Sequence, residues 1–134
     1  MTEEKILDKK ITIMLVDDDR FLLDMYSIKF KSSGFDIETI SGSADALTKL
    51  RAGAKPDVIL LDIIMPNMDG LELLKTIRDE KLAETSVVIM LTNQPDEMEK
   101  AQALGADGYI VKAVNIPSEV VNKVIEIYKS KKAK

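Results

Sequence analysis

The sequence of 134 residues contains no cysteine, no histidine and no tryptophan. Without cysteine the chain forms no disulfide, which is typical of proteins kept in a reducing cytoplasm. The absence of both histidine and cysteine excludes Ser-His-Asp and Cys-His catalysis and nearly every kind of zinc site. The side chains left for chemistry are carboxylates, hydroxyls and amines, which suit hard cations and phosphate.

Long apolar segments and an excess of positive charge are also missing. No stretch reaches the about 18 apolar residues of a membrane-spanning helix, and the first residues lack the apolar centre of a signal peptide. The chain has 19 basic and 23 acidic residues, a net charge of −4, whereas binding to a nucleic-acid backbone needs a concentrated positive face. We therefore expect a cytoplasmic protein with no membrane insertion and no direct contact with nucleic acid.

The length of the chain fits one domain. Apolar residues make up 46% of the sequence, which is enough to build one hydrophobic core at this size. We expect a flexible N-terminal lead over residues 1–10, a folded domain over residues 11–129 and a basic C-terminal tail over residues 130–134.

Five short apolar runs, rich in Ile, Val, Leu and Met, predict the strands of a sheet. Because most of these residues do not alternate with polar ones, the runs are typical of parallel strands buried on both faces. Each run is followed by a segment with apolar residues at helical spacing. This strict alternation predicts an α/β domain with a central parallel sheet and helices on both faces. The runs are Ile11–Val16, Phe35–Ile40, Val58–Leu61, Val87–Leu91 and Tyr109–Val111.

Turn and capping residues agree with this division. Gly34 and Gly105 stand where the first and fourth helices are expected to end. Ser43 and Asn115 are the predicted N-caps of the second and fifth helices. Pro117 fits the first turn of the fifth helix, where its missing N–H does no harm.

Polar side chains stand directly after four of the five runs. In a doubly wound sheet, ligands bind beyond the carboxyl ends of the strands. Three carboxylates brought together there repel one another, so one stays protonated unless a cation lies among them. Mg²⁺ suits carboxylate and water ligands. The residues concerned are Asp17, Asp18, Asp62, Thr92 and Lys112.

This combination predicts phosphoryl chemistry. A metal ion with an open position can coordinate a phosphoryl oxygen, and Lys112 offers a second positive charge to the same group. Asp62 could then attack as a carboxylate nucleophile and form an aspartyl phosphate. Each residue alone has an ordinary structural explanation, such as the N-cap role that we assign to Asp19. Convergence of several strand ends on one edge favours the site.

Four segments resemble the phosphoacceptor receiver domains of two-component signalling: IMLVDDD, PDVILLDIIMPNMDG, VIMLTNQ and GADGYIVKAV. The resemblance extends from Ile11 to Tyr128, and the order and spacing of the segments are similar to those of the family. It implies that residues 11–129 form a receiver domain. The implied fold is flavodoxin-like, a doubly wound five-stranded parallel sheet in the order 2-1-3-4-5.

The resemblance also implies a metal site. Asp62 matches the aspartate that the family phosphorylates. Asp18 matches the direct ligand of Mg²⁺, and Asp17 matches a ligand that acts largely through water. The backbone carbonyl of Ile64 would complete the protein's share of the metal shell, and Mn²⁺ suits the same ligands.

Three further residues match the family's switching machinery. Lys112 matches the lysine that pairs with the acceptor and then with its phosphate. Thr92 matches the switch hydroxyl, and Tyr109 matches the aromatic residue that turns inward as the hydroxyl moves. The implied donor is a histidine kinase or a histidine phosphotransfer protein. The fourth helix, the fifth strand and the fifth helix would form the face that a downstream protein reads.

The chain departs from the family pattern in three ways. Ala113 follows Lys112 where the family usually has proline, which leaves open whether this peptide bond is cis or trans. Asn93 replaces a small residue and could hinder access of a phosphoryl group. Ile64 and Gln94 occupy positions that tune dephosphorylation across the family. Because an apolar Ile64 should align an attacking water poorly, we predict a long-lived phosphoryl state.

Three functions are compatible with these residues. We favour a phosphorylation-dependent switch, whose only catalysis is its own phosphorylation and dephosphorylation. A phosphorylation-independent binding module of the same fold is the alternative that Ala113 and Asn93 keep open. An aspartate-nucleophile phosphohydrolase would need a DxDx[TV] motif where the Asp62 segment has DIIMP. Since few residues follow Tyr128, we expect the output to be contact with a protein.

Overall fold

A five-stranded parallel sheet forms the centre of the protein in the computed structural model, which describes residues 10–133. The strand order is β2-β1-β3-β4-β5, which confirms the order 2-1-3-4-5 that the resemblance implied. Apart from Lys10, the lead predicted over residues 1–10 lies outside the described residues. The strands are β1 (Thr12–Asp17), β2 (Asp36–Ser41), β3 (Val58–Leu61), β4 (Val87–Thr92) and β5 (Gly108–Val111).

The register brings the carboxyl ends of the inner strands level. Val16 of β1 pairs with Leu61 of β3, and Leu61 pairs with Met90 of β4. Thr92, the last residue of β4, pairs with Val111, the last residue of β5. The residues that follow these strands therefore leave the sheet at one edge, where ligands bind in doubly wound folds.

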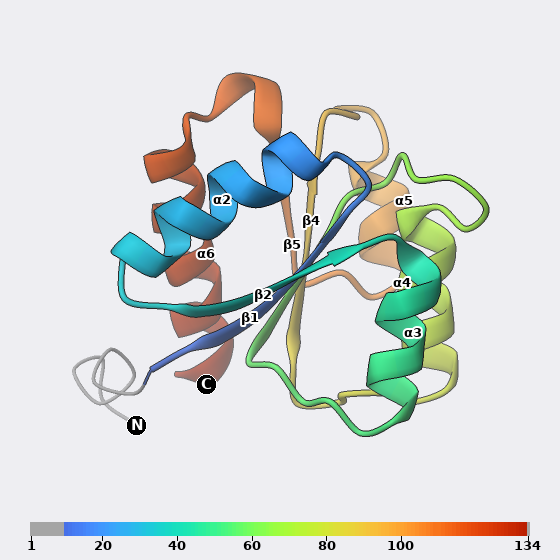
Figure 1. Ribbon diagram of the computed structural model, residues 1–134. Helices are drawn as coiled ribbons and strands as arrows, with labels where there is room; N and C mark the ends of the chain where they lie inside the picture. Colours follow the sequence, from blue (N-terminus) through green and yellow to red (C-terminus); the bar gives the residue numbers. More distant parts are fainter. Residues whose placement is uncertain (1–9, 134) are drawn as a thin grey trace.

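Helices cover both faces of the sheet (Figure 1). On one face lie α2 (Arg20–Ser32) and α6 (Pro117–Lys132). On the other lie α3 (Ser43–Arg51), α4 (Gly70–Asp79) and α5 (Met98–Ala103). In chain order, α2 to α6 are the first to fifth helices predicted from the sequence. A short 3₁₀ turn, η1 (Lys112–Val114), joins β5 to α6.

Each face of the sheet has its own hydrophobic core. Under α2 and α6 the cluster includes Phe30 and Phe35, whose rings meet edge to face with centroids 5.3 Å apart. Under α3, α4 and α5 it includes Leu73 and Ile77, both fully buried. Full burial of one such side chain contributes roughly 1.5–3 kcal/mol. Strands β3 and β4 supply residues to both clusters, which explains their continuous apolar sequence.

The structure corrects the prediction for β2. The run Phe35–Ile40 was expected to be buried on both faces, but β2 is an edge strand in which only Ile40 is buried. An edge strand has one neighbour, here β1, so its outer edge faces solvent. Polar residues make up most of Asp36–Ser41, and this is the signal for its exposure.

Several helix ends agree with the sequence prediction. The carboxylate of Asp19 accepts the N–H of Phe21 at 3.0 Å and so caps α2. Pro117 is the first residue of α6. Gly34 and Gly105 follow α2 and α5 with φ of 95° and 100°, the left-handed conformation that glycine tolerates best.

Two predicted caps are wrong. Ser43 is the first residue of α3 and donates its hydroxyl to the Met68 carbonyl at 2.7 Å, which ties α3 to the loop before α4. Asn115 precedes Ile116, the actual N-cap of α6, and donates its side-chain amide to the Val111 carbonyl. In both cases a tertiary or loop contact takes the polar group that the prediction assigned to the helix end.

The C-terminal segment is partly helical. α6 continues through Lys132, so residues 130–132 of the predicted tail belong to the helix. Within residues 10–133, none of the helices has the length and apolar character needed to cross a bilayer.

Candidate functional site

Three carboxylates meet at the carboxyl edge of the sheet. Asp17 ends β1, Asp18 follows it, and Asp62 follows β3. One carboxylate oxygen from each of the three lies within 4.8 Å of the others. Asp17 and Asp62 are 2% and 8% exposed, whereas Asp18 is open to solvent. The structure thus brings together the three acids predicted from the sequence, and we call this cluster the acidic rim.

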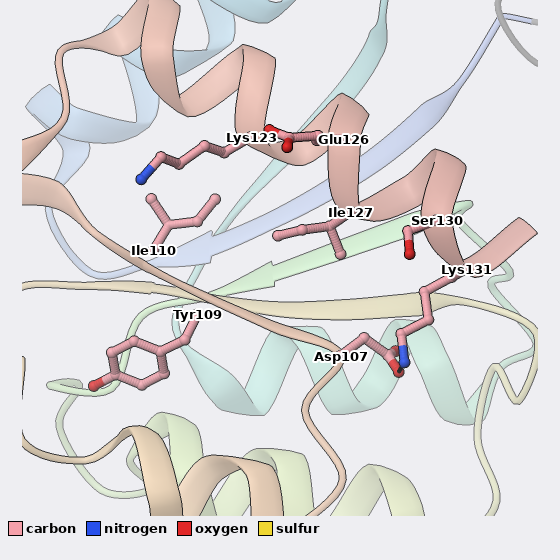
Figure 2. Close-up of a pocket in the computed structure, with 8 residues that line it drawn as sticks. All are labelled: Asp107, Tyr109, Ile110, Lys123, Glu126, Ile127, Ser130 and Lys131. Carbon is pink, nitrogen blue, oxygen red and sulfur yellow. Dashed lines mark ion pairs between the residues drawn. The ribbon is translucent and has the colours of Figure 1, made fainter. Parts of the chain in front are cut away.

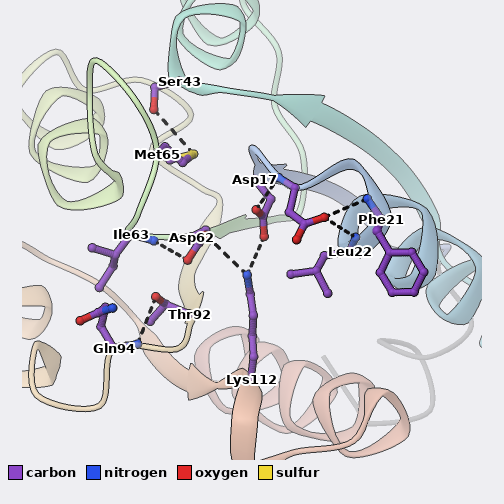
Figure 3. Close-up of polar contacts among 11 residues, drawn as sticks. Asp17, Phe21, Leu22, Ser43, Asp62, Ile63, Met65, Thr92, Gln94 and Lys112 are labelled. Atoms are coloured by element: carbon purple, nitrogen blue, oxygen red, sulfur yellow. Dashed lines mark hydrogen bonds and ion pairs between the residues drawn. The ribbon is translucent and has the colours of Figure 1, made fainter.

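Lys112 lies between the two buried carboxylates of the acidic rim (Figure 3). Its Nζ is 2.6 Å from Oδ2 of Asp17 and 3.5 Å from Oδ2 of Asp62. Burial lowers the pKa of Lys112, but the hydrogen bond with Asp17 and the two carboxylate charges outweigh burial and raise it. Because charges buried this far from water are screened weakly, the lysine stays an ammonium that both acids share.

The environment of Asp62 disfavours its negative charge. Burial raises the pKa of this carboxyl, the charge of Asp17 raises it further, and the charge of Lys112 lowers it. Hydrogen bonds from the Thr92 hydroxyl and the Ile63 N–H also lower it. The Ile63 N–H binds Oδ1 at 2.8 Å, while Oδ2 faces the lysine. One ammonium against three carboxylates leaves uncompensated negative charge at the rim.

A cavity of about 220 Å³ opens over the acidic rim. Ile64, Asn93 and Gln94 form part of its wall. Ile64 is 59% exposed at the opening, and Asn93 is exposed as well. One water occupies about 30 Å³ of liquid volume, so several water-sized groups fit. Asp62 is therefore buried in the protein yet open to small groups from solvent.

A glycine after the loop explains how Asp62 is held. Gly70 begins α4, and its N–H donates to the Ile63 carbonyl at 2.8 Å. A Cβ at Gly70 would lie 1.9 Å from the backbone oxygen of Asp62, so no other residue fits there without a shift of the loop. Asp69 and Glu72 form a capping box that fixes the start of the helix. The loop that follows β3 thus packs back against the carboxyl end of β3.

Thr92 and Tyr109 both contact Gln94 in the loop after β4. Thr92 is fully buried, and its hydroxyl accepts the Gln94 N–H at 3.4 Å. The hydroxyl of Tyr109 donates to the Gln94 carbonyl. The two residues predicted to act as switches are therefore joined through one residue of the loop.

The bond after Lys112 is trans, because the described residues contain no cis peptide. This decides an alternative that the sequence left open. Lys112 is the first residue of η1, and from there its ammonium reaches both buried carboxylates. Ala113 in place of proline therefore does not keep the lysine away from the acidic rim.

Comparison with known proteins assigns this arrangement to a family. The family model of the response regulator receiver domain matches residues 13–125. The protein belongs to this family. It has the receiver domain of two-component response regulators, as its four motifs predicted.

The receiver is similar to part of two larger regulators. It is 36% identical over 120 residues to the alkaline phosphatase synthesis transcriptional regulatory protein PhoP of Bacillus subtilis, covering 88% of this chain and 48% of PhoP. It is 36% identical over 115 residues to the DNA-binding response regulator MtrA of Mycobacterium tuberculosis, covering 84% and 48%. The chain thus spans about half the length of the curated relatives it matches.

Solved receiver structures match over nearly their whole length. The chemotaxis protein CheY4 of Vibrio cholerae superposes with a TM-score of 0.79 at 29% identity, covering 89% of this chain and 99% of CheY4. The response regulator TrrA of Thermotoga maritima, solved in complex with Mg²⁺ and BeF, has a TM-score of 0.76 at 30% identity, covering 87% and 98%. These matches confirm the predicted fold.

The sequence did not mark two neighbours of the receiver's acidic rim. Tyr26 is 2% exposed on the inner side of α2, where helical spacing predicts an ordinary core residue. Burial raises the pKa of its hydroxyl, and the charges of Lys112, Asp17 and Asp62 also act on it. Asn115 is 8% exposed beside the turn that carries the lysine. Tyr26 shows no sequence signal because its surroundings depend on how distant segments pack, and Asn115 was predicted only as a cap because its contact with Val111 depends on the shape of a turn.

A larger cavity of about 410 Å³ lies between β5 and α6 of the receiver (Figure 2). Ile110 and Ile127 line it, and Tyr109 projects from β5 away from α6. Among the described residues, the acidic rim is the one place where three metal-ligating side chains converge. We therefore place the chemistry at the smaller cavity and regard the larger one as part of the predicted output face.

Proposed function

We propose that the receiver takes a phosphoryl group on Asp62, with Mg²⁺ held at the acidic rim, and then presents a changed surface to a partner protein. One observation supports this most strongly. Two buried carboxylates share a single buried lysine, and a third, exposed carboxylate lies beside them beneath a cavity that is open to solvent. Such a site has charge to hold a cation and room to admit a phosphoryl group.

The donor atoms of the rim fit a hard divalent cation. Asp18, which is exposed, would bind directly, Asp17 largely through water, and Asp62 through its own carboxylate. The backbone carbonyl of Ile64, which borders the same cavity, would complete the set. Mg²⁺ keeps several waters and needs few protein ligands, and Mn²⁺ accepts the same oxygens. When bound, such an ion neutralises charge on the acceptor and on phosphoryl oxygens.

Asp62 would act as the nucleophile. A carboxylate oxygen forms a bond to phosphorus while the P–N bond of the donor phosphohistidine breaks, and its electron pair stays on the imidazole nitrogen. The ammonium of Lys112 would move its contact to the new phosphoryl oxygens. Since the chain has no histidine, the donor histidine belongs to another protein, a histidine kinase or a histidine phosphotransfer protein.

The response would pass through Thr92 and Tyr109. Phosphorylation adds charge and strong acceptor oxygens at the rim. The Thr92 hydroxyl would donate to one of them and loosen its long contact with the Gln94 N–H. Because the Tyr109 hydroxyl is hydrogen-bonded to the carbonyl of the same Gln94, a shift of the loop after β4 reaches β5 and the adjoining helices α5 and α6. We expect a downstream protein to read this face, which contains the cavity of Figure 2.

The walls of the cavity favour a long-lived phosphoryl state. Hydrolysis needs a water aligned with phosphorus, and Ile64, an exposed side chain in the wall of the cavity, can neither donate nor accept a hydrogen bond. Rapid loss of phosphate from the purified protein in Mg²⁺ would contradict this prediction.

A phosphorylation-independent binding module is the second candidate. Asn93 favours it, because this amide stands in the wall of the cavity above the acceptor. Direct contact with nucleic acid is not part of either proposal. PhoP and MtrA are named as transcriptional and DNA-binding regulators, but this chain covers 48% of each. Our expectation of a cytoplasmic chain that does not bind nucleic acid itself stays a prediction.

Intact mass spectrometry after incubation with acetyl phosphate tests the first proposal. With Mg²⁺ the parent chain is expected to gain one phosphoryl group, and with EDTA none. Asp62→Asn is expected to gain none under either condition. Asp107→Asn, which changes an aspartate far from the rim, is the matched control and should behave as the parent. If the parent gains nothing with Mg²⁺, or if Asp62→Asn gains as much as the parent, the proposal is wrong.

A further inference from the structure

The turn after β5 is held by a buried asparagine. Asn115 directly follows η1 and is 8% exposed. Its side-chain Nδ2 donates to the Val111 carbonyl at 2.8 Å. Its backbone N–H donates to the Lys112 carbonyl at 3.3 Å. One residue thus binds two consecutive carbonyls of the turn.

Those two carbonyls belong to the peptide groups on either side of the Lys112 Cα. Each peptide group is planar, so the orientations of two neighbouring planes determine φ and ψ of the residue between them. The two hydrogen bonds of Asn115 therefore restrict the backbone of Lys112 on both sides. Ala113 adds no ring constraint of its own, so the restriction depends on the asparagine.

The direction in which the lysine leaves the backbone matters for the acidic rim. The ammonium lies 2.6 Å from Asp17 and 3.5 Å from Asp62, and its side chain is 7% exposed. Because the side chain is buried along its way to the two carboxylates, a change in the backbone orientation of Lys112 changes where the ammonium lies. Displacement of such a group by about 1 Å can slow a reaction by about 100-fold.

We propose that Asn115 is a positioning residue that holds the Lys112 ammonium between Asp17 and Asp62. The inference rests on the proposed function, in which Lys112 serves the phosphoryl group on Asp62. It adds a residue from the loop whose side chain does not line the cavity over the rim. Asn115 acts only through the lysine and touches neither carboxylate.

Two measurements on Asn115→Ala test this role. The rate of phosphorylation by acetyl phosphate in Mg²⁺ is expected to fall by about 10-fold or more, because the ammonium loses its place. The affinity for Mg²⁺, measured by calorimetric titration, is expected to rise several-fold, because a cation that competes for Asp17 is released. Simple loosening of the site would lower both quantities, so the opposite signs identify positioning.

A double-mutant cycle separates an effect through the lysine from any other effect. In a Lys112→Ala background, Asn115→Ala should leave the Mg²⁺ affinity unchanged. Asn115→Leu keeps the branched shape of asparagine without its donor. It takes the place of Asn115→Ala if the smaller side chain impairs folding, and the same two effects are expected for it. Glu119→Ala is the matched control. It removes the acceptor of the Ile116 N–H, 2.9 Å away at the start of α6, and leaves both bonds of Asn115 intact.

The outcomes distinguish this inference from the proposed function. If the parent chain accepts no phosphate, the proposed function fails, and the titrations still report on the position of the lysine. If the parent is phosphorylated and the two asparagine variants match it in rate and in Mg²⁺ affinity, the positioning role is wrong. Equal effects of Asn115→Ala with and without Lys112 would also overturn it.

Discussion

Two aspartates at opposite ends of the sheet have contrasting surroundings. Asp107 precedes β5, and its Oδ2 accepts the Val88 N–H at 2.9 Å and lies 3.2 Å from Nη2 of Arg78. Its Oδ1 lies 3.5 Å from Nζ of Lys131. At the other end, Asp62 shares one lysine with a second buried acid and lies near a third.

The two ends use the same residue types for different purposes. At Asp107, two cations and a backbone N–H meet one carboxylate, so its charge is balanced within the protein. The contact joins β4, α4 and α6, and its side chains are 21–48% exposed. At the acidic rim, three carboxylates meet one ammonium. The ratio of cations to carboxylates, rather than the presence of aspartate and lysine, distinguishes the proposed metal site from a structural crosslink.

The largest effect is expected from removal of the exposed carboxylate of the rim. In Asp18→Ala the affinity for Mg²⁺ should fall by more than about 100-fold, because even loss of a residue that merely supports a metal ligand costs about 10–100-fold. Calorimetric titration of the parent and the variant measures this. Asp107→Asn should bind Mg²⁺ as the parent does. Retention of the parent affinity by Asp18→Ala would remove the difference between the two ends.

The second prediction concerns the balanced end. Asp107→Ala leaves the Val88 N–H without its acceptor and removes the partner of Arg78. We expect a loss of about 1–3 kcal/mol in the free energy of unfolding, as for a polar group left unpaired. Urea denaturation measures it, and Mg²⁺ binding should not change. An Asp107→Ala protein as stable as the parent would show that this end is not the structural crosslink.

A smaller effect on stability, of opposite sign, is expected at the rim. Burial raises the pKa of Asp62, so the folded protein holds this proton more tightly than the unfolded chain does. The stability contributed by Asp62 is therefore complete below the unfolded value of about 3.9 and is lost as the pH rises through the raised folded-state pKa. In EDTA, Asp62→Asn should melt at a higher temperature than the parent at pH 7.

That gain should disappear as the pH falls towards about 4, where the parent carboxyl is protonated too. Thermal melts of the two proteins across this range measure the difference, in which all other groups cancel. A variant that is less stable than the parent at pH 7 would mean that Lys112 compensates the charge of Asp62 fully.

The smallest effect on phosphorylation is expected for removal of the fully buried Thr92 hydroxyl beside the acidic rim. Thr92→Ala should accept phosphate from acetyl phosphate nearly as the parent does, because the proposed attacking group is Asp62. The change of the Tyr109 environment on phosphorylation, followed by the NMR signals of its ring, should be much reduced. If Thr92→Ala responds as fully as the parent, the relay through Gln94 is wrong.

The sequence was sufficient for the fold because buried parallel strands leave continuous apolar runs, and β3 matches its run Val58–Leu61 residue for residue. It was also sufficient to bring Asp17, Asp62 and Lys112 together, since each directly follows or ends a strand. The burial expected for β2 was wrong, because the apolar run was interpreted without regard to the edge position that the order 2-1-3-4-5 gives to this strand. Asn115 was mistaken for a cap because its partner, the Val111 carbonyl, is set by the shape of a turn.

Residues whose role depends on the close approach of separate segments could not be predicted from the sequence either. Gly70 is required because its Cα lies against the backbone of Asp62, a contact between two loop ends that no spacing encodes. Tyr26 looks like any apolar stripe residue of a helix, although its hydroxyl lies within electrostatic reach of the rim. The charge balance at Asp107 became visible only when α4 and α6 were placed beside it.

The most direct test of uncompensated charge at the acidic rim is a titration of the ¹⁵N-labelled chain with Mn²⁺, followed by the paramagnetic broadening of backbone amide signals. We predict selective loss of the signals of Asp18 and Ile63 at low Mn²⁺, their recovery with excess Mg²⁺, and unaffected signals for Asp107 and Lys131. Broadening around Asp107, or no selective broadening at all, would contradict the account.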